Sequence, residues 1–247
     1  MKIIISPAKK MNEVRDIIDT TKPLFLAEAE EIAKVVSGFS VEEIQKKMLC
    51  NAKLANLTKE RYEKIKFNCS GSPAILAYEG LQYKYMSPKV FSEEQFKYVS
   101  EHLIILSGLY GGLRALDDVE PYRLEMQAKI AIGEYKNLYQ FWGSKIYDTL
   151  LAAEEEVIDL ASDEYSIAVR KYAKSTQQWI QVIFGEEICG KIIEKGAYVK
   201  MARGEMVDYM ATINANTAND IKGFNRLGYK FSEKYSTKQK YTFIKEK

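Results

Sequence analysis

The chain has 247 residues, of which 47% are hydrophobic, 28% charged and 12% aromatic, a balance that excludes a disordered or low-complexity protein. Its 36 Lys and Arg residues and 34 Asp and Glu residues leave a net charge of +2, which excludes the strongly basic balance of a protein that coats nucleic acid. Any nucleic-acid site must therefore be a local patch. Because no repeat or linker rich in Pro, Gly or Ser divides the chain, we expect a single domain over residues 1–247.

Cysteine and histidine are too few for a metal centre built from them. Cys50, Cys69 and Cys189 are far apart, and His102 is the only histidine. Scattered cysteines in odd number are typical of a reducing compartment, whereas zinc and iron–sulfur sites need several ligands at short spacing. The apolar run after Met1 is too short for a signal peptide, and no stretch is long enough to span a membrane. We therefore expect a cytoplasmic protein with no metal, no other cofactor and no membrane partner.

The first part of the chain predicts one strand followed by three helices. The β-branched run at 2–5 ends at Ser6-Pro7 and predicts a buried strand that leads into a loop. Apolar spacings of three and four predict helices over 24–38, 41–48 and 52–66. Ser40 and Glu43 form the capping box of the second of these helices. A turn follows at 70–73, and loose alternation over 74–86 predicts a strand or ribbon.

The second part alternates strands and helices irregularly. A helix capped by Ser92 and Gln95 precedes a buried strand, and later segments include a helix marked by Met206 and Met210. We predict strands at 103–106, 157–161, 179–184, 198–201, 224–231 and 241–244, and a helix at 146–153. The pattern predicts a mixed α/β (α+β) fold with a central mixed sheet flanked by helices. Because no strand leads into a GxGxxG or GxxxxGK[ST] loop, a dinucleotide fold or a P-loop NTPase is excluded.

Polar loops follow three predicted buried strands, and sites in sheet proteins often lie at such strand ends. After the first strand, Lys9 supplies charge and Ser6 a hydroxyl for an anion, although the segment also fits a solvated loop. After the third, Ser162 fits a helix N-cap, with Asp163 and Glu164 favoured in the first helical turn. Alternatively, Asp163 or Glu164 acts as a general base or hard-metal ligand with a partner such as Glu125 or Glu205.

The second of these loops, over 106–126, is rich in glycine and arginine. Gly108, Gly111 and Gly112 permit backbone N–H groups to approach a phosphate, which Arg114 and Arg123 would clamp. The spacing of Gly108 and Gly111 fits neither a helix-hairpin-helix motif nor a KH loop cleanly. The alternative is a tight turn in which the arginines pair with Asp117, Asp118 or Glu125.

Taken together, six segments resemble the YaaA family of bacterial peroxide-stress proteins, and the resemblance spans nearly the whole chain. The segments are 5–9 (ISPAK), 106–111 (LSGLYG), 121–126 (PYRLEM), 138–143 (LYQFWG), 160–165 (LASDEY) and Ala202-Arg203-Gly204. One departure is Ala115, which follows Arg114 where the family usually has proline, and a looser turn is the consequence.

The resemblance implies a cytoplasmic protein that lowers unincorporated iron and so limits Fenton damage by hydrogen peroxide. It also implies DNA binding, without sequence specificity, through a positively charged cleft and a helix-hairpin-helix-like element. Transferred to this chain, the glycine turn corresponds to Gly108 and Gly111. The basic positions correspond to Lys9, Arg114, Arg123 and Arg203.

Two hypotheses from different classes follow, and the resemblance favours the first. In the first, a non-enzymatic protein binds DNA phosphates through its arginines. In the second, an enzyme acts on a small anionic or nucleotide-like substrate, which Lys9 and Arg123 hold while Glu125, Asp163 or Glu164 moves protons and Ser6 donates a hydrogen bond. A deep pocket that gathers these residues would favour the enzyme, and a shallow basic groove would favour nucleic acid. Direct iron storage is a weaker third idea, since no Glu-x-x-His motif is present.

Overall fold

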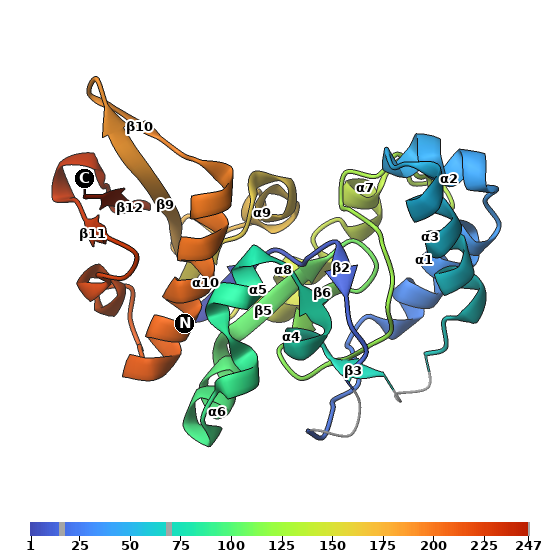
Figure 1. Ribbon diagram of the computed structural model, residues 1–247, viewed down its shortest axis with the longest axis horizontal. Helices are drawn as coiled ribbons and strands as arrows, with labels where there is room; N and C mark the ends of the chain where they lie inside the picture. The colour runs from blue at the N-terminus through green and yellow to red at the C-terminus, as the bar shows by residue number, and fades with distance from the viewer. Residues whose placement is uncertain (15–17, 68–70, 247) are drawn as a thin grey trace.

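A sheet dominated by parallel strands forms the centre of the computed structural model, which describes residues 1–14, 18–67 and 71–246 (Figure 1). Within these residues the strand order is β11-β12-β9-β8-β1-β5-β6, and β10 pairs with β9 outside this path. The strands are β1 (Lys2–Ile5), β5 (Leu103–Ser107), β6 (Gly111–Arg114), β8 (Glu156–Leu160), β9 (Gln178–Ile188), β10 (Lys191–Ile193), β11 (Tyr229–Phe231) and β12 (Lys240–Lys245). Strands β12, β9, β8, β1 and β5 run parallel, and antiparallel β11 and β6 close the two edges. The predicted mixed α/β fold is confirmed.

Helices surround the sheet, and Figure 1 shows α1, α2 and α3 grouped at the end of the molecule opposite to β10, β11 and β12. The helices are α1 (Leu26–Ser37), α2 (Val41–Met48), α3 (Ala52–Lys64), α4 (Ala74–Ala77), α5 (Leu81–Met86), α6 (Glu93–His102), α7 (Leu138–Trp142), α8 (Lys145–Leu150), α9 (Asp163–Arg170) and α10 (Gly196–Ile213). Short bridges join β2 (Lys10–Met11) to β4 (Tyr78–Glu79) and β3 (Ser72–Pro73) to β7 (Asp118–Val119). Short 3-10 turns lie at Pro88–Val90, Asp220–Gly223 and Glu233–Tyr235.

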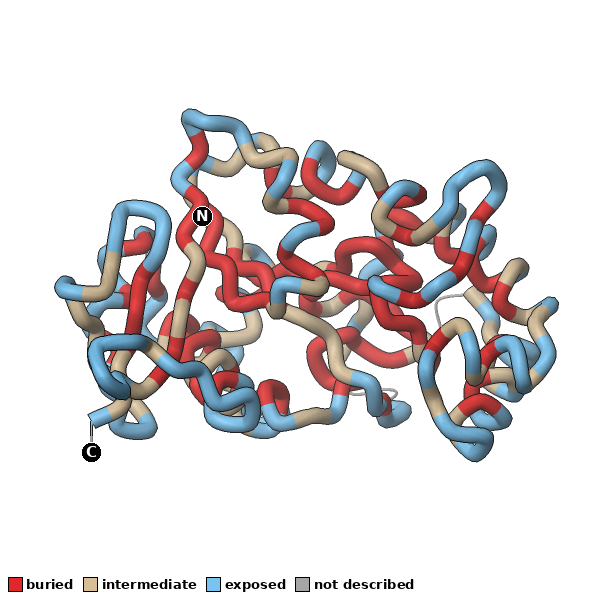
Figure 2. Tube along the Cα trace, turned by 90° about the horizontal axis from the view of Figure 1, so that it is seen from above, coloured by how far each residue is buried: buried red, intermediate tan, exposed pale blue. Residues whose placement is uncertain are grey.

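The core lies along the central strands because the sheet is covered on both faces. Ile3, Ile4 and Ile5 of β1 are all fully buried, and the apolar residues of β5 are equally enclosed. Near-continuous apolar runs of this kind are what a parallel strand between two layers requires. Figure 2 shows the buried segments running through the middle of the molecule, with exposed segments towards its outer loops.

Local signals placed most of the early helices correctly. The predicted capping box of α2 is present, since Glu43 N donates to Ser40 Oγ at 3.2 Å and Ser40 N donates to Glu43 Oε2 at 2.9 Å. The box of α6 is likewise formed by Ser92 and Gln95. The strands at 103–106, 157–161, 179–184 and 241–244 are confirmed, with bounds that differ by no more than four residues at either end. Of the predicted turn at 70–73, Ser70 lies outside the described residues, and so does Cys69.

Two predicted strands are wrong. Residues 74–86 form α4, β4 and α5, because burial of Gln82, Tyr83 and Met86 follows a helical spacing. Residues 198–201 belong to α10, in which burial of Val199, Ala202 and Met206 continues down one helical face. The short alternation of polar and apolar residues at 198–201 is therefore the beginning of a helical stripe.

The prediction of a helix-hairpin-helix-like element at Gly108 and Gly111 is also wrong. The turn joins β5 to β6 as an antiparallel β-hairpin, in which Ser107 is opposite Gly111 and Leu106 is opposite Gly112. Gly111 has a φ of +68°, and a Cβ at this position would come within 2.6 Å of the Trp142 ring. The glycine is thus explained by backbone conformation and close packing.

The contact between α10 and α5 depends on Gly204. A Cβ at Gly204 would lie 2.1 Å from the carbonyl oxygen of Gln82 and 2.9 Å from the amide nitrogen of Met86. Only glycine lets the two helical backbones approach this closely. The contact fixes the residue that precedes Gly204, Arg203, against the rest of the molecule.

We predict that Gly204→Ala destabilises the protein by about 1–3 kcal/mol, the usual cost of adding a methyl group to a filled interface. Gly196→Ala is the matched control in the same helix, because nothing lies within 4 Å of the added Cβ. Chemical denaturation of the two variants and the parent measures the difference. Equal stability of the two variants would contradict this account of the α5–α10 contact.

Candidate functional site

A pocket of about 320 Å³ lies where β1 and β8 end. From β1 the sheet extends to β5 and β6 on one side and to β8 on the other, so the connections depart in opposite directions. Ligand sites in open α/β sheets lie at such a switch point, outside the carboxyl ends of the strands. This site pocket is lined by Ser6, Pro7, Ala8, Lys9, Lys10, Glu79, Gly80, Leu81, Gln82, Tyr83, Tyr122, Arg123, Leu124, Glu125, Ser162, Glu164, Tyr165, Lys200 and Arg203.

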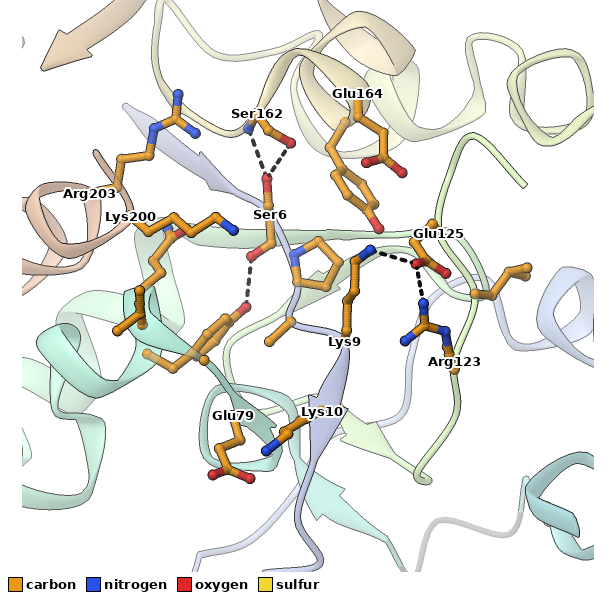
Figure 3. Close-up of a pocket in the computed structure, with 18 of the residues that line it drawn as sticks. Ser6, Lys9, Lys10, Glu79, Arg123, Glu125, Ser162, Glu164, Lys200 and Arg203 are labelled. Atoms are coloured by element: carbon orange, nitrogen blue, oxygen red, sulfur yellow. Dashed lines mark hydrogen bonds and ion pairs between the residues drawn. The ribbon is translucent and has the colours of Figure 1, made fainter. Parts of the chain in front are cut away.

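One end of the site pocket carries two cations beside a pair of serines. We call it the cationic end, and it consists of Ser6, Ser162, Lys200 and Arg203. Ser6 Oγ accepts a hydrogen bond from Ser162 N at 2.8 Å and lies 3.1 Å from Ser162 Oγ. Ser162 is the N-cap residue of α9, as predicted, but its hydroxyl makes no capping bond and contacts Ser6 instead. In Figure 3 the side chains of Lys200 and Arg203 point towards the two serines.

Arg203 carries its charge into this end without a direct partner. Its Nε is buried and has no hydrogen-bond partner among the described residues. Burial lowers the pKa of Arg203 from its usual range, although Glu194, Asp159 and Asp163 attract its charge from a distance. Leaving a buried charged donor unpaired costs free energy. A bound anion would recover that cost.

The opposite end is charge-balanced. We call it the paired end, and it consists of Lys9, Arg123, Glu125 and Glu164. Lys9 Nζ and Arg123 Nη2 both contact Glu125 Oε1, at 2.9 and 2.7 Å (Figure 3). Within the described part of the chain, Glu125 Oε2 and Arg123 Nε are buried without hydrogen-bond partners. With Arg203 Nε and Gln82 Nε2, four such atoms belong to residues that line this one pocket.

Gly108 packs against the backbone of the segment that carries the paired end. A Cβ on Gly108 would lie 2.6 Å from the carbonyl oxygen of Leu124, which stands between Arg123 and Glu125. The carbonyl of Gly108 accepts a hydrogen bond from Trp142 Nε1 at 3.1 Å. The glycine therefore permits close approach of backbone to backbone.

Glu164 is the carboxyl in the site pocket whose proton affinity the structure changes most clearly. Burial raises its pKa above the usual value, and repulsion from Glu125 acts in the same direction. Lys9 and a hydrogen bond from Gln127 N to Glu164 Oε1, at 3.3 Å, oppose this shift. A carboxyl of this kind holds a proton closer to neutral pH than a solvated one.

Tyrosines form part of the wall, and they are hydrogen-bonded phenols. The hydroxyl of Tyr122 lies 2.6 Å from Ser107 Oγ and 2.7 Å from the hydroxyl of Tyr78. Tyr83 donates to the Ser6 carbonyl at 3.0 Å. Burial raises the pKa of Tyr122 to about 12, so its hydroxyl is a weaker acid than a solvated phenol. Among residues 1–14, 18–67 and 71–246, no three His, Cys, Asp or Glu side chains are placed to hold a metal ion.

Not every predicted site residue lies in the site pocket. Ser6, Lys9, Arg123, Glu125, Glu164 and Arg203 line it, whereas Gly108, Gly111, Arg114 and Asp163 do not. Arg114 pairs with Asp117 at 2.7 Å and donates to the Lys22 carbonyl, as the structural alternative predicted. Asp163 is largely exposed and lies 3.6 Å from Arg170.

The glycine turn is not open to a phosphate. Residues 108–113 are buried, and the amides of Leu109 and Tyr110 already donate to Ser107 Oγ, at 3.2 and 2.9 Å. The predicted phosphate cradle at Gly108 and Gly111 is therefore corrected to a structural turn.

Lys10, Gln82 and Lys200 line the site pocket, and the sequence analysis did not identify them. Lys200 precedes Arg203 by three residues, which places the two cations on one face of α10. Reading 198–201 as part of a helix would have revealed this pair. Lys10 directly follows Lys9 in the polar loop after the first strand, where an anion site was expected, whereas the sequence carries no comparable signal for Gln82.

Comparison with known proteins identifies the family of this chain. The family model for the peroxide stress protein YaaA matches residues 1–235. The chain belongs to the YaaA family of peroxide stress proteins. It is 45% identical to a UPF0246 protein of Desulfitobacterium hafniense over 99% of this chain and 98% of that protein. For UPF0246 proteins of Lachnoclostridium phytofermentans and Pediococcus pentosaceus the identities are 42% and 43%, over 99% of this chain and 96% and 98% of theirs.

The family therefore places this chain among bacterial peroxide-stress proteins, and the resemblance identified from six segments is confirmed. No helix in the described part of the chain has the length and apolar character needed to cross a bilayer.

We predict that Glu164→Gln raises the melting temperature at neutral pH. Because the pKa of Glu164 is raised in the folded protein, its ionisation disfavours folding above that pKa. The gain should shrink as pH falls through the raised pKa towards the ordinary value of 4.5, below which both states are protonated. Thermal unfolding across this pH range measures it.

The control for this experiment is Asp163→Asn, which removes a carboxyl from the same first turn of α9 but from an exposed side chain. Both changes lose the interaction with the helix dipole. A gain for Glu164→Gln that is no larger at neutral than at acid pH would contradict the assignment.

Proposed function

We propose that this chain limits unincorporated iron during peroxide stress and that it binds DNA through cations around the site pocket. The iron role is what membership of the family suggests for this chain. The observation that supports anion binding is the charge of the site pocket, in which five cationic side chains face three carboxylates. The net charge of the whole chain is only +2, so this local excess is distinctive.

The exposed lysines suit contact with a nucleic-acid backbone. Lys9, Lys10 and Lys200 are exposed at the site pocket. A neighbouring groove shares Glu79–Leu81 and Tyr83 with that pocket and adds exposed Lys84 and Lys89. Flexible lysines on a surface contact phosphates, which position a protein on DNA without reading its sequence. We therefore propose binding without sequence specificity.

A second candidate function is catalysis on a small anionic substrate in the same pocket. The specific observation that favours it is Glu164, whose pKa is raised by burial next to Lys9 and Glu125. A carboxyl with a raised pKa binds a proton more readily than a solvated one and suits proton transfer, while the cationic end holds the anion. Turnover of a substrate that survives unchanged in Glu164→Gln would contradict this role.

We predict that deleting the gene raises chelatable iron and sensitivity to hydrogen peroxide. A plasmid copy of the wild-type gene should restore both, and an Arg203→Gln copy should not, because Arg203 supplies the buried charge of the site pocket. Electron paramagnetic resonance of chelated ferric iron in whole cells measures the iron pool. An unchanged iron pool in the peroxide-stressed deletion strain would contradict the proposed role in limiting iron.

We predict that Lys10→Gln and Lys84→Gln each weaken duplex binding to a similar degree for unrelated sequences. Each lost phosphate contact should reduce the slope of log K against log salt by about 0.9. Lys191→Gln is the control, since Lys191 is exposed on β10 and lies outside both grooves. Fluorescence anisotropy titrations at several salt concentrations give the slopes. Wild-type affinity and slope in both variants would show that these lysines do not contact DNA.

A further inference from the structure

The two ends of the site pocket are complementary to different chemical groups of one ligand. In Figure 3 the two cations of the cationic end, Lys200 and Arg203, lie on the opposite side of Ser6 from the paired end, and the cationic end contains no carboxylate. Neither Lys200 nor Arg203 forms an ion pair with any residue that the structure describes. The paired end holds two cations and two carboxylates, so it offers hydrogen bonds without net charge.

The donors of the cationic end suit a phosphate group. The two serine hydroxyls have two protons, and their mutual contact at 3.1 Å uses one of them. Since Ser6 Oγ also accepts from Ser162 N, the other proton remains free to donate to a ligand. A planar guanidinium, an ammonium and a hydroxyl proton thus line the same end of the pocket, and together they are a typical set of phosphate-binding groups.

The paired end suits a neutral group with adjacent donors and acceptors. Arg123 Nε is a donor and Glu125 Oε2 an acceptor, and both are buried without partners among the described residues. The two side chains are tied together by the contact between Arg123 Nη2 and Glu125 Oε1. Nucleobase edges present complementary pairs, as in the contacts of Arg with guanine and of carboxylates with the cytosine amino group.

The walls and the volume of the site pocket fit one planar ring system. Pro7, Tyr83, Tyr122 and Tyr165 also line it, and bases stack well on tyrosine rings. Its volume of about 320 Å³ is at the lower limit for small-molecule sites. A double helix cannot enter a pocket of this size, but a single nucleotide unit can.

We propose that the site pocket binds one nucleotide, with the phosphate at the cationic end and the base at the paired end. The base reaches Arg123 Nε and Glu125 Oε2 when these side chains turn from their mutual contact. This proposal rests on the proposed function, because it names the ligand class of the same site. The nucleotide is either a free mononucleotide or an unpaired nucleotide in a DNA strand that lies along the exposed lysines.

Calorimetric titration of the full chain tests whether the ligand is a free mononucleotide. The probes are nucleoside monophosphates, the matching nucleosides and inorganic phosphate. At least one monophosphate should bind about tenfold more tightly than its nucleoside or inorganic phosphate, since each end adds charge-assisted hydrogen bonds. Arg203→Gln should remove the advantage over the nucleoside, and Glu125→Gln the advantage over inorganic phosphate. Arg170→Gln is the control with the same change of charge, because Arg170 does not line the site pocket.

Titration with DNA tests whether the ligand is an unpaired nucleotide in a DNA strand. A duplex with one unpaired nucleotide should then bind more tightly than a fully paired duplex, and Arg203→Gln should abolish this preference in a variant shown by circular dichroism to be folded. The proposal is overturned if inorganic phosphate matches every monophosphate and the unpaired nucleotide confers no preference. It is equally overturned if neither the monophosphates nor the unpaired duplex show the expected advantage.

The outcomes separate this proposal from DNA binding as such. Binding of fully paired duplex with the expected salt slope, but without nucleotide discrimination, overturns the nucleotide site and leaves the DNA proposal intact. Nucleotide discrimination without any duplex binding does the reverse.

Discussion

Parallel pairing of β1 between β5 and β8 is the constraint on which the site depends. It brings three strand ends to one edge of the sheet, and each end carries a serine, namely Ser107 on β5, Ser6 after β1 and Ser162 after β8. Ser6 contacts Ser162, and Ser107 contacts Tyr122, at 3.1 and 2.6 Å. These hydroxyl bonds tie the loops to one another across the strand ends. The site pocket therefore lies on rigid elements, although most of its lining residues come from loops.

Buried polar atoms without hydrogen-bond partners lower the stability of the fold at this edge. Arg203 Nε, Arg123 Nε and Glu125 Oε2 are buried without partners among the described residues, and each such atom weakens the folded state. Close backbone contacts hold these side chains in place despite that cost. Gly204 lets α10, which carries Arg203, pack closely against α5, and Gly108 packs closely against the backbone of Leu124. A protein under selection for stability alone would replace these charges with apolar residues. Their presence together in one pocket is the strongest physical argument that the pocket has a ligand.

Much of the fold was predictable from sequence because local signals and tertiary packing agree there. The capping boxes at Ser40 and Ser92 and the isoleucines of β1 are read correctly from short windows. The sequence also predicted three functional loops after strands, and the structure brings residues of all three, among them Ser6, Arg123 and Ser162, into the site pocket. The predictions were wrong where contacts between residues far apart in the sequence determine the local structure. The glycines at 108 and 111 suggested an open loop, but Leu124 and Trp142 fill the space that a side chain would need.

The exposed lysines and the partly buried Arg203 differ in how strongly solvent acts on them, and this separates two modes of binding in one basic site. Lys10 and Lys84 are exposed, so salt screens their attraction for a phosphate backbone. Arg203 is largely enclosed, and burial already lowers its pKa, so its attraction for a phosphate in the site pocket is screened much less. Surface contacts can therefore hold an extended anion loosely while the pocket holds a single anionic group more specifically. A chain with nearly balanced total charge can do both, because five of its cations line one pocket at the edge of the sheet where parallel strands end.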